Sequence, residues 1–256
     1  MKRFLVFLPL MITIVFLGAS FTVRAADYFG VFCQKYFAHD PERPYAYTHC
    51  QRFIDNFAPV ASLRWYYLLQ GCANRGFTDL DGDPNCGGID SVKLAYVSSH
   101  GGSDATRSWI ALQDGSTLSD WWHFGNNAVE ASIYAMKACT TMPVDAAHGG
   151  TAALWTRFAE VFRSGTRMIL GAYDSMYSGW SHQNEGGTFA TYLRWGLPVN
   201  VAWRAAYSAH HPNTMATGTN SNDCWNRLNG ITWNNHKAFP KLAGGSVGYW
   251  CARWGW

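Results

Sequence analysis

Residues 93–102 read KLAYVSSHGG, and residues 131–139 read ASIYAMKAC. Each stretch is a run of mostly apolar residues of strand length, and each ends abruptly. The first run ends in a histidine and two glycines, and the second ends in a cysteine. Continuous apolar runs of this length are typical of strands that are buried on both faces of a parallel sheet. The two runs therefore predict two central strands whose ends carry His100 and Cys139.

Further strands and helices alternate along the chain. Strand-like runs occupy residues 28–37, 108–112 and 166–173, whereas apolar residues at helical spacing occupy residues 50–62, 63–70, 149–165, 188–196 and 198–211. This alternation predicts an α/β fold in three α/β/α layers, with a mostly parallel central sheet. In such sheets the functional crevice lies at the carboxyl ends of the strands. From about Thr214 the chain is rich in Asn, Gly and Trp, which predicts irregular structure or a small antiparallel hairpin.

The N-terminal 25 residues have the pattern of a secretory signal peptide. Lys2 and Arg3 precede the apolar run from Phe4 to Gly18, and Val23 and Ala25 stand at the spacing that signal peptidase accepts. The apolar run is short for a membrane span, so we expect cleavage rather than stable membrane anchoring. The mature protein is then expected to be secreted or periplasmic.

Residues 26–256 have the length of a single domain. Without the signal peptide, 17 basic residues balance 17 acidic ones, which argues against a nucleic-acid partner. Charged residues make up 14% of the chain and aromatic residues 16%, a composition that favours a compact globule over disorder.

Seven cysteines in an exported chain predict disulfides with at least one thiol left over. Six of them form couples that are close in sequence: 33 with 50, 72 with 86, and 224 with 251. This pairing is a hypothesis, because sequence does not fix connectivity, and it leaves Cys139 alone. A single thiol after a buried strand is either inert core packing or a nucleophile.

The predicted ends of the two central strands combine the groups that thiol catalysis needs. A cysteine attacks as its thiolate, and a neighbouring histidine can accept its proton. Gly101 lacks a side chain, so its N–H could approach a substrate closely and, with the N–H of Cys139, hold a developing oxyanion. The alternative is that His100 is a structural histidine that binds a backbone group. His148, in a second His-Gly-Gly, follows no apolar strand and is interpreted as part of a loop.

These residues carry a resemblance to a known group of enzymes. An apolar block ending in His-Gly, followed 39 residues after its histidine by a cysteine at the end of a second block, resembles the caspase–legumain–gingipain group of cysteine peptidases. RSGTRMILGAYDSM and GGTFATYLRWGLPVNVAWRAAY resemble the segments that follow the cysteine in bacterial members. Over about residues 28–210 the chain most resembles a family of secreted bacterial proteins defined by the domain DUF6345.

The resemblance implies a caspase-like fold and a peptidase that acts on peptides or proteins. It implies Cys139 as the nucleophile, His100 as the general base and acid, the Gly101 N–H as an oxyanion donor, and no required cofactor. The loops that build the substrate pocket in the peptidases, and an activation cleavage site, are not recognisable here. Arg167, Arg194, Asp174 and Glu185 are open candidates to line a pocket. The alternative is a catalytically silent fold that binds a ligand or carbohydrate.

An acidic loop is a candidate calcium site. Oxygen-bearing side chains occupy positions 1, 3, 5, 7 and 12 of a twelve-residue loop and suit Ca²⁺: Asp79, Asp81, Asp83, Asn85 and Asp90. Position 6 is Pro84, where an EF-hand has glycine, so the alternative is a solvated turn. The histidines show no zinc motif, and adjacent His210 and His211 are expected to point apart.

Thirteen tryptophans support the carbohydrate-binding alternative, in which exposed rings stack on sugars. The candidate rings are Trp121, Trp122, Trp180, Trp250, Trp254 and Trp256.

Overall fold

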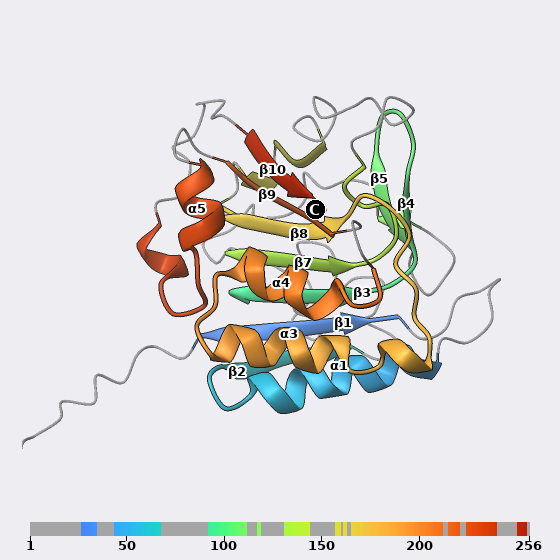
Figure 1. The fold of residues 1–256 in the computed structure, drawn as a ribbon, viewed down its shortest axis with the longest axis horizontal. Helices are drawn as coiled ribbons and strands as arrows, with labels where there is room; N and C mark the ends of the chain where they lie inside the picture. The colour runs from blue at the N-terminus through green and yellow to red at the C-terminus, as the bar shows by residue number, and fades with distance from the viewer. Residues whose placement is uncertain are drawn as a thin grey trace, which may run out of the picture.

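A computed structural model describes residues 27–34, 44–67, 92–111, 117–118, 131–143, 157–159, 161–162, 165–211, 215–220, 224–239 and 250–254. Its centre is a seven-stranded sheet with the strand order β10-β9-β8-β7-β3-β1-β2 (Figure 1). The strands are β1 (Tyr28–Cys33), β2 (Ser62–Tyr67), β3 (Leu94–Ser98), β7 (Ile133–Lys137), β8 (Met168–Ala172), β9 (Met215–Asn220) and β10 (Trp250–Trp254). The five strands from β2 to β8 in this order are parallel, and β9 and β10 continue the sheet in antiparallel pairing. The predicted α/β class and mostly parallel sheet are confirmed.

A second, smaller sheet begins directly after His100. It consists of β4 (Gly101–Ser103), β5 (Ser108–Ala111) and β6 (Thr117–Leu118) in antiparallel order. The strand predicted at residues 108–112 therefore exists but lies outside the central sheet. The Ala111 N–H donates to the His100 carbonyl at 2.9 Å, so the small sheet fixes the chain where it leaves β3.

Three helices cover one face of the central sheet: α1 (Pro44–Phe57), α3 (Glu185–Arg194) and α4 (Val199–Tyr207) (Figure 1). In α1, Cys50, Phe53, Ile54 and Phe57 recur at helical spacing and are buried. The ring of Phe53 stacks on Tyr96 of β3, with ring centroids 4.4 Å apart. This aromatic contact packs α1 against β3 in the centre of the sheet.

The opposite face of the sheet is also buried. Phe32, Val97, Met136 and Ile169 alternate along their strands with the residues that face α1, α3 and α4, and all four are buried. Residues 157–159 and 161–162 are helical, and they contribute Phe158, Val161 and Phe162 to the buried set. Gly165, predicted to end this helix, has φ 115°, a left-handed conformation that favours glycine.

Two predictions of local structure were wrong in part. Residues 63–70 were expected to be helical, but Ser62–Tyr67 form β2, which pairs with β1. The aromatic segment WYY suits a strand, and sheet pairing outweighed its apolar spacing. The tail does contain an antiparallel pair, but β9 joins β8 and so extends the central sheet. Between β9 and β10 lie two elements that were not predicted, the helix α5 (Cys224–Gly230) and the 3₁₀ helix η5 (His236–Ala238).

One predicted disulfide is confirmed: Cys33 at the end of β1 is bonded to Cys50 of α1, with 6.6 Å between their Cα atoms. Cys72 and Cys86 lie outside the described residues, and the side chains of Cys224 and Cys251 are not described. Cys139 is a free thiol, as expected.

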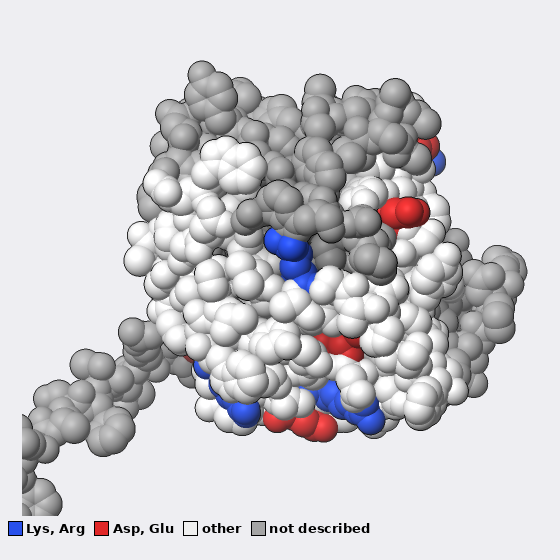
Figure 2. All heavy atoms as spheres, viewed as in Figure 1, with Lys and Arg blue, Asp and Glu red and all other residues white. Residues whose placement is uncertain are grey.

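The expected signal peptide, residues 1–25, lies outside the described residues. Within the part of the chain that is described, none of the helices has the length and apolar character needed to cross a membrane. On the face that carries α1, α3 and α4, most of the described surface is uncharged, and charged side chains gather mainly along the edge over α1 (Figure 2).

Candidate functional site

The two central strands end side by side. β3 and β7 are parallel neighbours, with Ser98 paired to Lys137, and the Ser99 N–H donates to the Lys137 carbonyl at 3.2 Å. His100 and Cys139 each follow two residues beyond this last pair. The register therefore brings both residues to equivalent positions at the carboxyl edge of the sheet, as the sequence predicted.

Gly101 packs directly against the cysteine. A Cβ atom built on Gly101 would lie 2.7 Å from the Cys139 carbonyl oxygen and 2.8 Å from the Cβ of Ala138. Because only glycine fits at this distance, the glycine after His100 has a steric reason in the structure.

The N–H of Gly101 does not take part in the hydrogen bonds between β4 and β5. In antiparallel pairs, hydrogen-bonded and non-hydrogen-bonded positions alternate. Since Ala111 donates to His100, the next pair, Gly101 with Ile110, is a non-hydrogen-bonded position. The Gly101 N–H therefore points away from β5, as an oxyanion donor would have to.

The Cys139 thiol is half-buried and contacts the main chain of Met176. The Met176 N–H lies 3.2 Å from Sγ, and Sγ lies 3.4 Å from the Met176 carbonyl oxygen. Met176 belongs to the segment between β8 and α3, residues 173–184, which we call the β8–α3 segment. The thiol therefore accepts from the Met176 N–H and donates to the Met176 carbonyl oxygen, which fixes the position of the sulfur beside the β8–α3 segment.

The residue after the cysteine has a strained backbone. Thr140 has φ 47°, which is rare for a β-branched residue, and its N–H donates to the Asp174 carbonyl at 3.0 Å. Such conformations cluster at functional sites, where the surrounding structure holds them in place. Here the hydrogen bond ties the turn after β7 to the β8–α3 segment.

A buried ion pair lies two residues before the cysteine. The Nζ atom of Lys137 is 2.9 Å from Oε2 of Glu185, the first residue of α3, and these side chains are 0% and 2% exposed. Lys137 also donates to the Tyr177 carbonyl at 3.2 Å. Lys137 and Cys139 thus hold consecutive residues of the β8–α3 segment.

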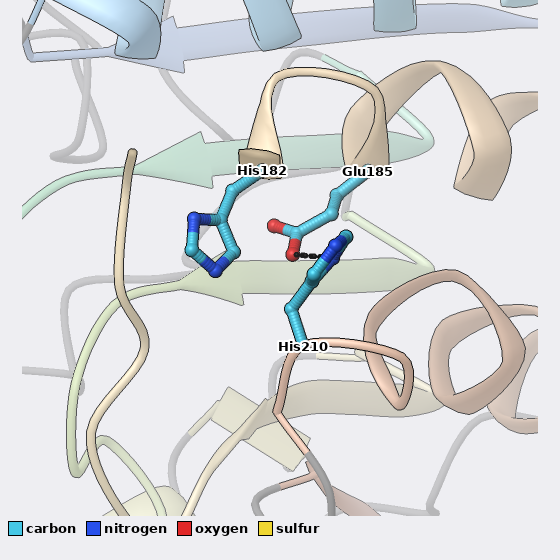
Figure 3. A group of neighbouring side chains, drawn as sticks. All are labelled: His182, Glu185 and His210. Atoms are coloured by element: carbon cyan, nitrogen blue, oxygen red, sulfur yellow. Dashed lines mark hydrogen bonds and ion pairs between the residues drawn. The ribbon is translucent and has the colours of Figure 1, made fainter. Parts of the chain in front are cut away.

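Two histidines reach the other carboxylate oxygen of Glu185. Nδ1 of His210 lies 3.2 Å from Oε1 and Nε2 of His211 lies 3.1 Å from it. Figure 3 shows His182, Glu185 and His210 facing one another. The expectation that His210 and His211 point apart is wrong, because both lie in the turn that follows α4, where neighbouring side chains need not diverge as on a helix.

The environment sets the charges in this cluster. Burial alone would raise the pKa of Glu185, but its contacts with His211 and Lys137 lower it below its ordinary value. Burial lowers the pKa of His182, which the negative charge of Glu185 only partly opposes. At neutral pH, Glu185 is therefore ionised and His182 is neutral.

The polar network continues beneath the helices to α1. The hydroxyls of Tyr207 and Tyr96 lie 2.7 Å apart, Nδ1 of His49 lies 3.0 Å from the Tyr96 hydroxyl, and Nε2 of His49 lies 3.0 Å from Oγ of Ser98. Burial raises the pKa of Tyr207 well above its ordinary value, so its hydroxyl stays protonated. The network satisfies polar groups buried at the carboxyl end of the sheet.

Of the residues that were candidates to line a pocket, two are engaged elsewhere. Arg167 is buried before β8, where it bonds Ser132 and the Phe239 carbonyl, far along the strand from the Cys139 edge. Glu185 is buried, and its negative charge is paired with the ammonium group of Lys137. Arg194 and Asp174 are exposed, and Asp174 lies next to the cysteine turn through its bond to Thr140.

The proposed calcium ligands Asp79, Asp81, Asp83, Asn85 and Asp90 lie outside the described residues, as does His148. Trp121, Trp122 and Trp256 also lie outside, and the side chains of Trp250 and Trp254 are not described. Trp180 is 72% exposed, and two exposed rings that were not singled out are Trp195 and Trp225.

Comparison with known proteins matches residues 36–254 to a family model described as "Domain of unknown function (DUF6345)". The family expected from the sequence is thus confirmed, over a range that also includes the tail. No curated protein matches the chain. Among solved structures, the Drosophila initiator caspase Dronc is similar, with 10% identity, a TM-score of 0.47, and coverage of 75% of this chain and 78% of that chain.

Proposed function

We propose that this chain, which belongs to the DUF6345 family, is an exported cysteine hydrolase that cleaves peptide bonds through an acyl-enzyme on Cys139. The observation that carries the proposal is the free, half-buried Cys139 thiol at the end of β7, packed beside the Gly101 that follows His100 at the end of β3. A nucleophile, a base and an oxyanion donor from two adjacent strand ends are the parts that acyl transfer needs.

In the proposed reaction, the Cys139 sulfur forms a bond to the carbonyl carbon of the substrate while His100 takes the thiol proton. The Gly101 and Cys139 N–H groups donate to the carbonyl oxygen as it becomes negative. His100 then gives its proton to the leaving amine as the C–N bond breaks. Water attacks the thioester with His100 as the base, which releases the acid and restores the thiol.

Thiol alkylation tests the proposed dyad. We expect iodoacetamide to label Cys139 at pH 6–7 faster than it labels a free-thiol peptide, and His100→Ala to reduce the rate to that of the peptide. Peptide mapping by mass spectrometry identifies the labelled cysteine. His210→Ala is the matched control, a histidine at the same edge of the sheet that should leave the rate unchanged. Equal alkylation rates for the wild type, His100→Ala and the peptide would contradict the proposed Cys139–His100 dyad.

Peptide cleavage is the second measurement. We expect the mature protein to cleave members of an internally quenched peptide library, and Cys139→Ser and His100→Ala to lose this cleavage. Trapping a thioester on Cys139 by acid quench would support an acyl-enzyme. A fast-reacting thiol with no cleavage of peptides or other acyl substrates would instead favour the catalytically silent alternative.

A hollow between α1 and α3 supports carbohydrate binding as a second candidate function. Its volume is about 400 Å³, and the exposed ring of Trp195 lies beside Tyr192, with centroids 5.6 Å apart. The lining combines these rings with amide, hydroxyl and guanidinium groups: Arg52, Asn56, Asn184, Gly187, Thr188, Thr191, Tyr192 and Trp195. Apolar ring faces with a few polar groups suit sugars, which present both kinds of surface.

A fluorescence titration with a panel of oligosaccharides tests this candidate. We expect Trp195→Ala to abolish any binding and Trp225→Ala, which removes an exposed ring on α5, to preserve it. Binding that is unaffected by Trp195→Ala would exclude the hollow.

A further inference from the structure

We propose that His182, Glu185 and His210 form a binding site for a divalent transition-metal ion, with Zn²⁺ as the fitting example. One ligand atom from each of these side chains lies within 4.8 Å of the others, and Figure 3 shows the three groups converging. Two imidazoles and one carboxylate are a ligand set that zinc and related ions use with a further position open.

The fold supplies the three ligands from separate elements. His182 ends the 3₁₀ helix η4 (Trp180–His182), Glu185 begins α3, and His210 lies in the turn after α4. The first two are three residues apart in sequence, with only the turn at residues 183–184 between η4 and α3. The packing of α3 against α4 brings the third to them from 25 residues further along the chain.

The interatomic distances are close to those of a zinc site. With zinc–ligand bonds of about 2.0–2.1 Å, the ligand atoms of a tetrahedral site lie about 3.4 Å apart. Nδ1 of His210 is already 3.2 Å from Oε1 of Glu185. The 4.8 Å limit on the group means that His182 must move closer by no more than about 1.4 Å. A change of side-chain torsion is enough for such a movement.

The surrounding contacts orient the carboxylate. Lys137 lies 2.9 Å from Oε2, so an ion would bind Glu185 through Oε1 alone. Nε2 of buried His211 lies 3.1 Å from the same oxygen, Oε1, on the side away from solvent. Partners of this kind behind a ligand fix its orientation in metal sites. His210 is 35% exposed, which leaves the site open to solvent on one side.

Ligation by His182 requires a change of tautomer that the structure can accommodate. Nδ1 of His182 accepts the Gly179 N–H at 3.0 Å, and Ser181 Oγ lies 3.2 Å from the same nitrogen. An ion on Nε2 moves the ring proton to Nδ1, where Ser181 Oγ can accept it in place of the Gly179 contact.

The positive charge of Lys137 predicts the direction in which metal affinity should change when this residue is replaced. Its ammonium group lies beside the carboxylate and opposes a dication. If Glu185 is a ligand, Lys137→Met should tighten metal binding, because it removes this repulsion. If Lys137 only orders the carboxylate and no ion binds there, the same variant should leave metal binding unchanged.

The test is a titration of the mature protein with Co²⁺ and Zn²⁺ in the Cys139→Ser background. We expect one equivalent to bind, with visible cobalt bands and no thiolate-to-cobalt charge-transfer band. His182→Ala and His210→Ala should each weaken binding at least tenfold, and Glu185→Gln likewise. Circular dichroism checks that each variant is folded, and His210, being partly exposed, is the variant least coupled to folding.

His100→Ala is the matched control and should bind the ion as tightly as the parent. Affinity that is unchanged in His182→Ala and His210→Ala would overturn the proposal, as would binding by the wild-type protein that is absent from the Cys139→Ser background. The metal site does not rest on the proposed hydrolase. A slow thiol with intact metal binding would reject the dyad only, and a fast thiol without metal binding would reject the metal site only.

Discussion

Replacement of Lys137 by Met tests whether the buried ion pair stabilises the fold. The pair joins Nζ to Oε2 over 2.9 Å, with side chains 0% and 2% exposed. Removing one partner of a buried pair leaves a charge without its counter-ion, at a cost of about 3–5 kcal/mol. Because His210 and His211 still contact Oε1, we expect the lower end, about 3 kcal/mol.

The assay is urea unfolding at pH 7, with the free energy of unfolding compared at equal m-values. The double variant Lys137→Met/Glu185→Gln should recover part of the loss, because it removes the orphaned charge. Arg107→Met is the control, since the Arg107–Asp104 pair has a similar distance of 3.0 Å but side chains 59% and 47% exposed. We expect no measurable loss there. If Lys137→Met behaves like Arg107→Met, the reasoning from burial is refuted.

The pH dependence of the same pair follows from the lowered pKa of Glu185 in the folded state. The stability from its ionised form is fully present above the unfolded value, about 4.3, and is lost as the pH falls through the folded value. The difference in unfolding free energy between wild type and Glu185→Gln should therefore shrink below about pH 4. A difference that grows on acidification would contradict the assigned direction.

Three further changes probe the neighbourhood of the cysteine. Thr140→Gly should stabilise the protein by up to about 1 kcal/mol in urea unfolding, because relief of left-handed strain exceeds the entropy cost of glycine; a net loss would argue against strain. Gly101→Ala should lower the free energy of unfolding by about 1–3 kcal/mol and slow alkylation of Cys139, because the new Cβ atom would lie 2.7 Å from the Cys139 carbonyl oxygen. Gly230→Ala is the control and should cost less, because its nearest atom would lie 3.3 Å from the new Cβ. Removing the disulfide by a Cys33→Ala/Cys50→Ala change should cost about 3 kcal/mol, given the sequence separation of 17 residues; an unchanged thermal midpoint would contradict it.

The central strands could be predicted because their signal is local. LAYVS and IYAMK are apolar over their whole length, and each ends in residues of a different chemical kind, so both the strands and the positions of His100 and Cys139 followed from short windows. The segment WYY in β2 was ambiguous, because apolar spacing in so short a run fits helix and strand alike.

The histidine cluster could not be found from local patterns. His182 and Glu185 do have a readable three-residue spacing, but His210 joins them only through the packing of α3 against α4. Lys137 was likewise counted as one residue of an apolar strand, and nothing near it in sequence indicates its partner on α3. The strain at Thr140 depends on its bond to Asp174, another contact between distant segments.

Met176 and Tyr177 are consecutive residues held by two side chains at the end of β7: Met176 contacts the sulfur of Cys139, two residues beyond the strand, and Tyr177 contacts the ammonium group of Lys137, its last residue. An acyl group or an oxygen atom added to that sulfur would displace the Met176 contact and leave the Lys137 contact as the remaining tether of the pair to β7. Trp180, 72% exposed, lies three residues further on. Trp180 therefore belongs to the same segment that a modified sulfur would release from one of its two contacts.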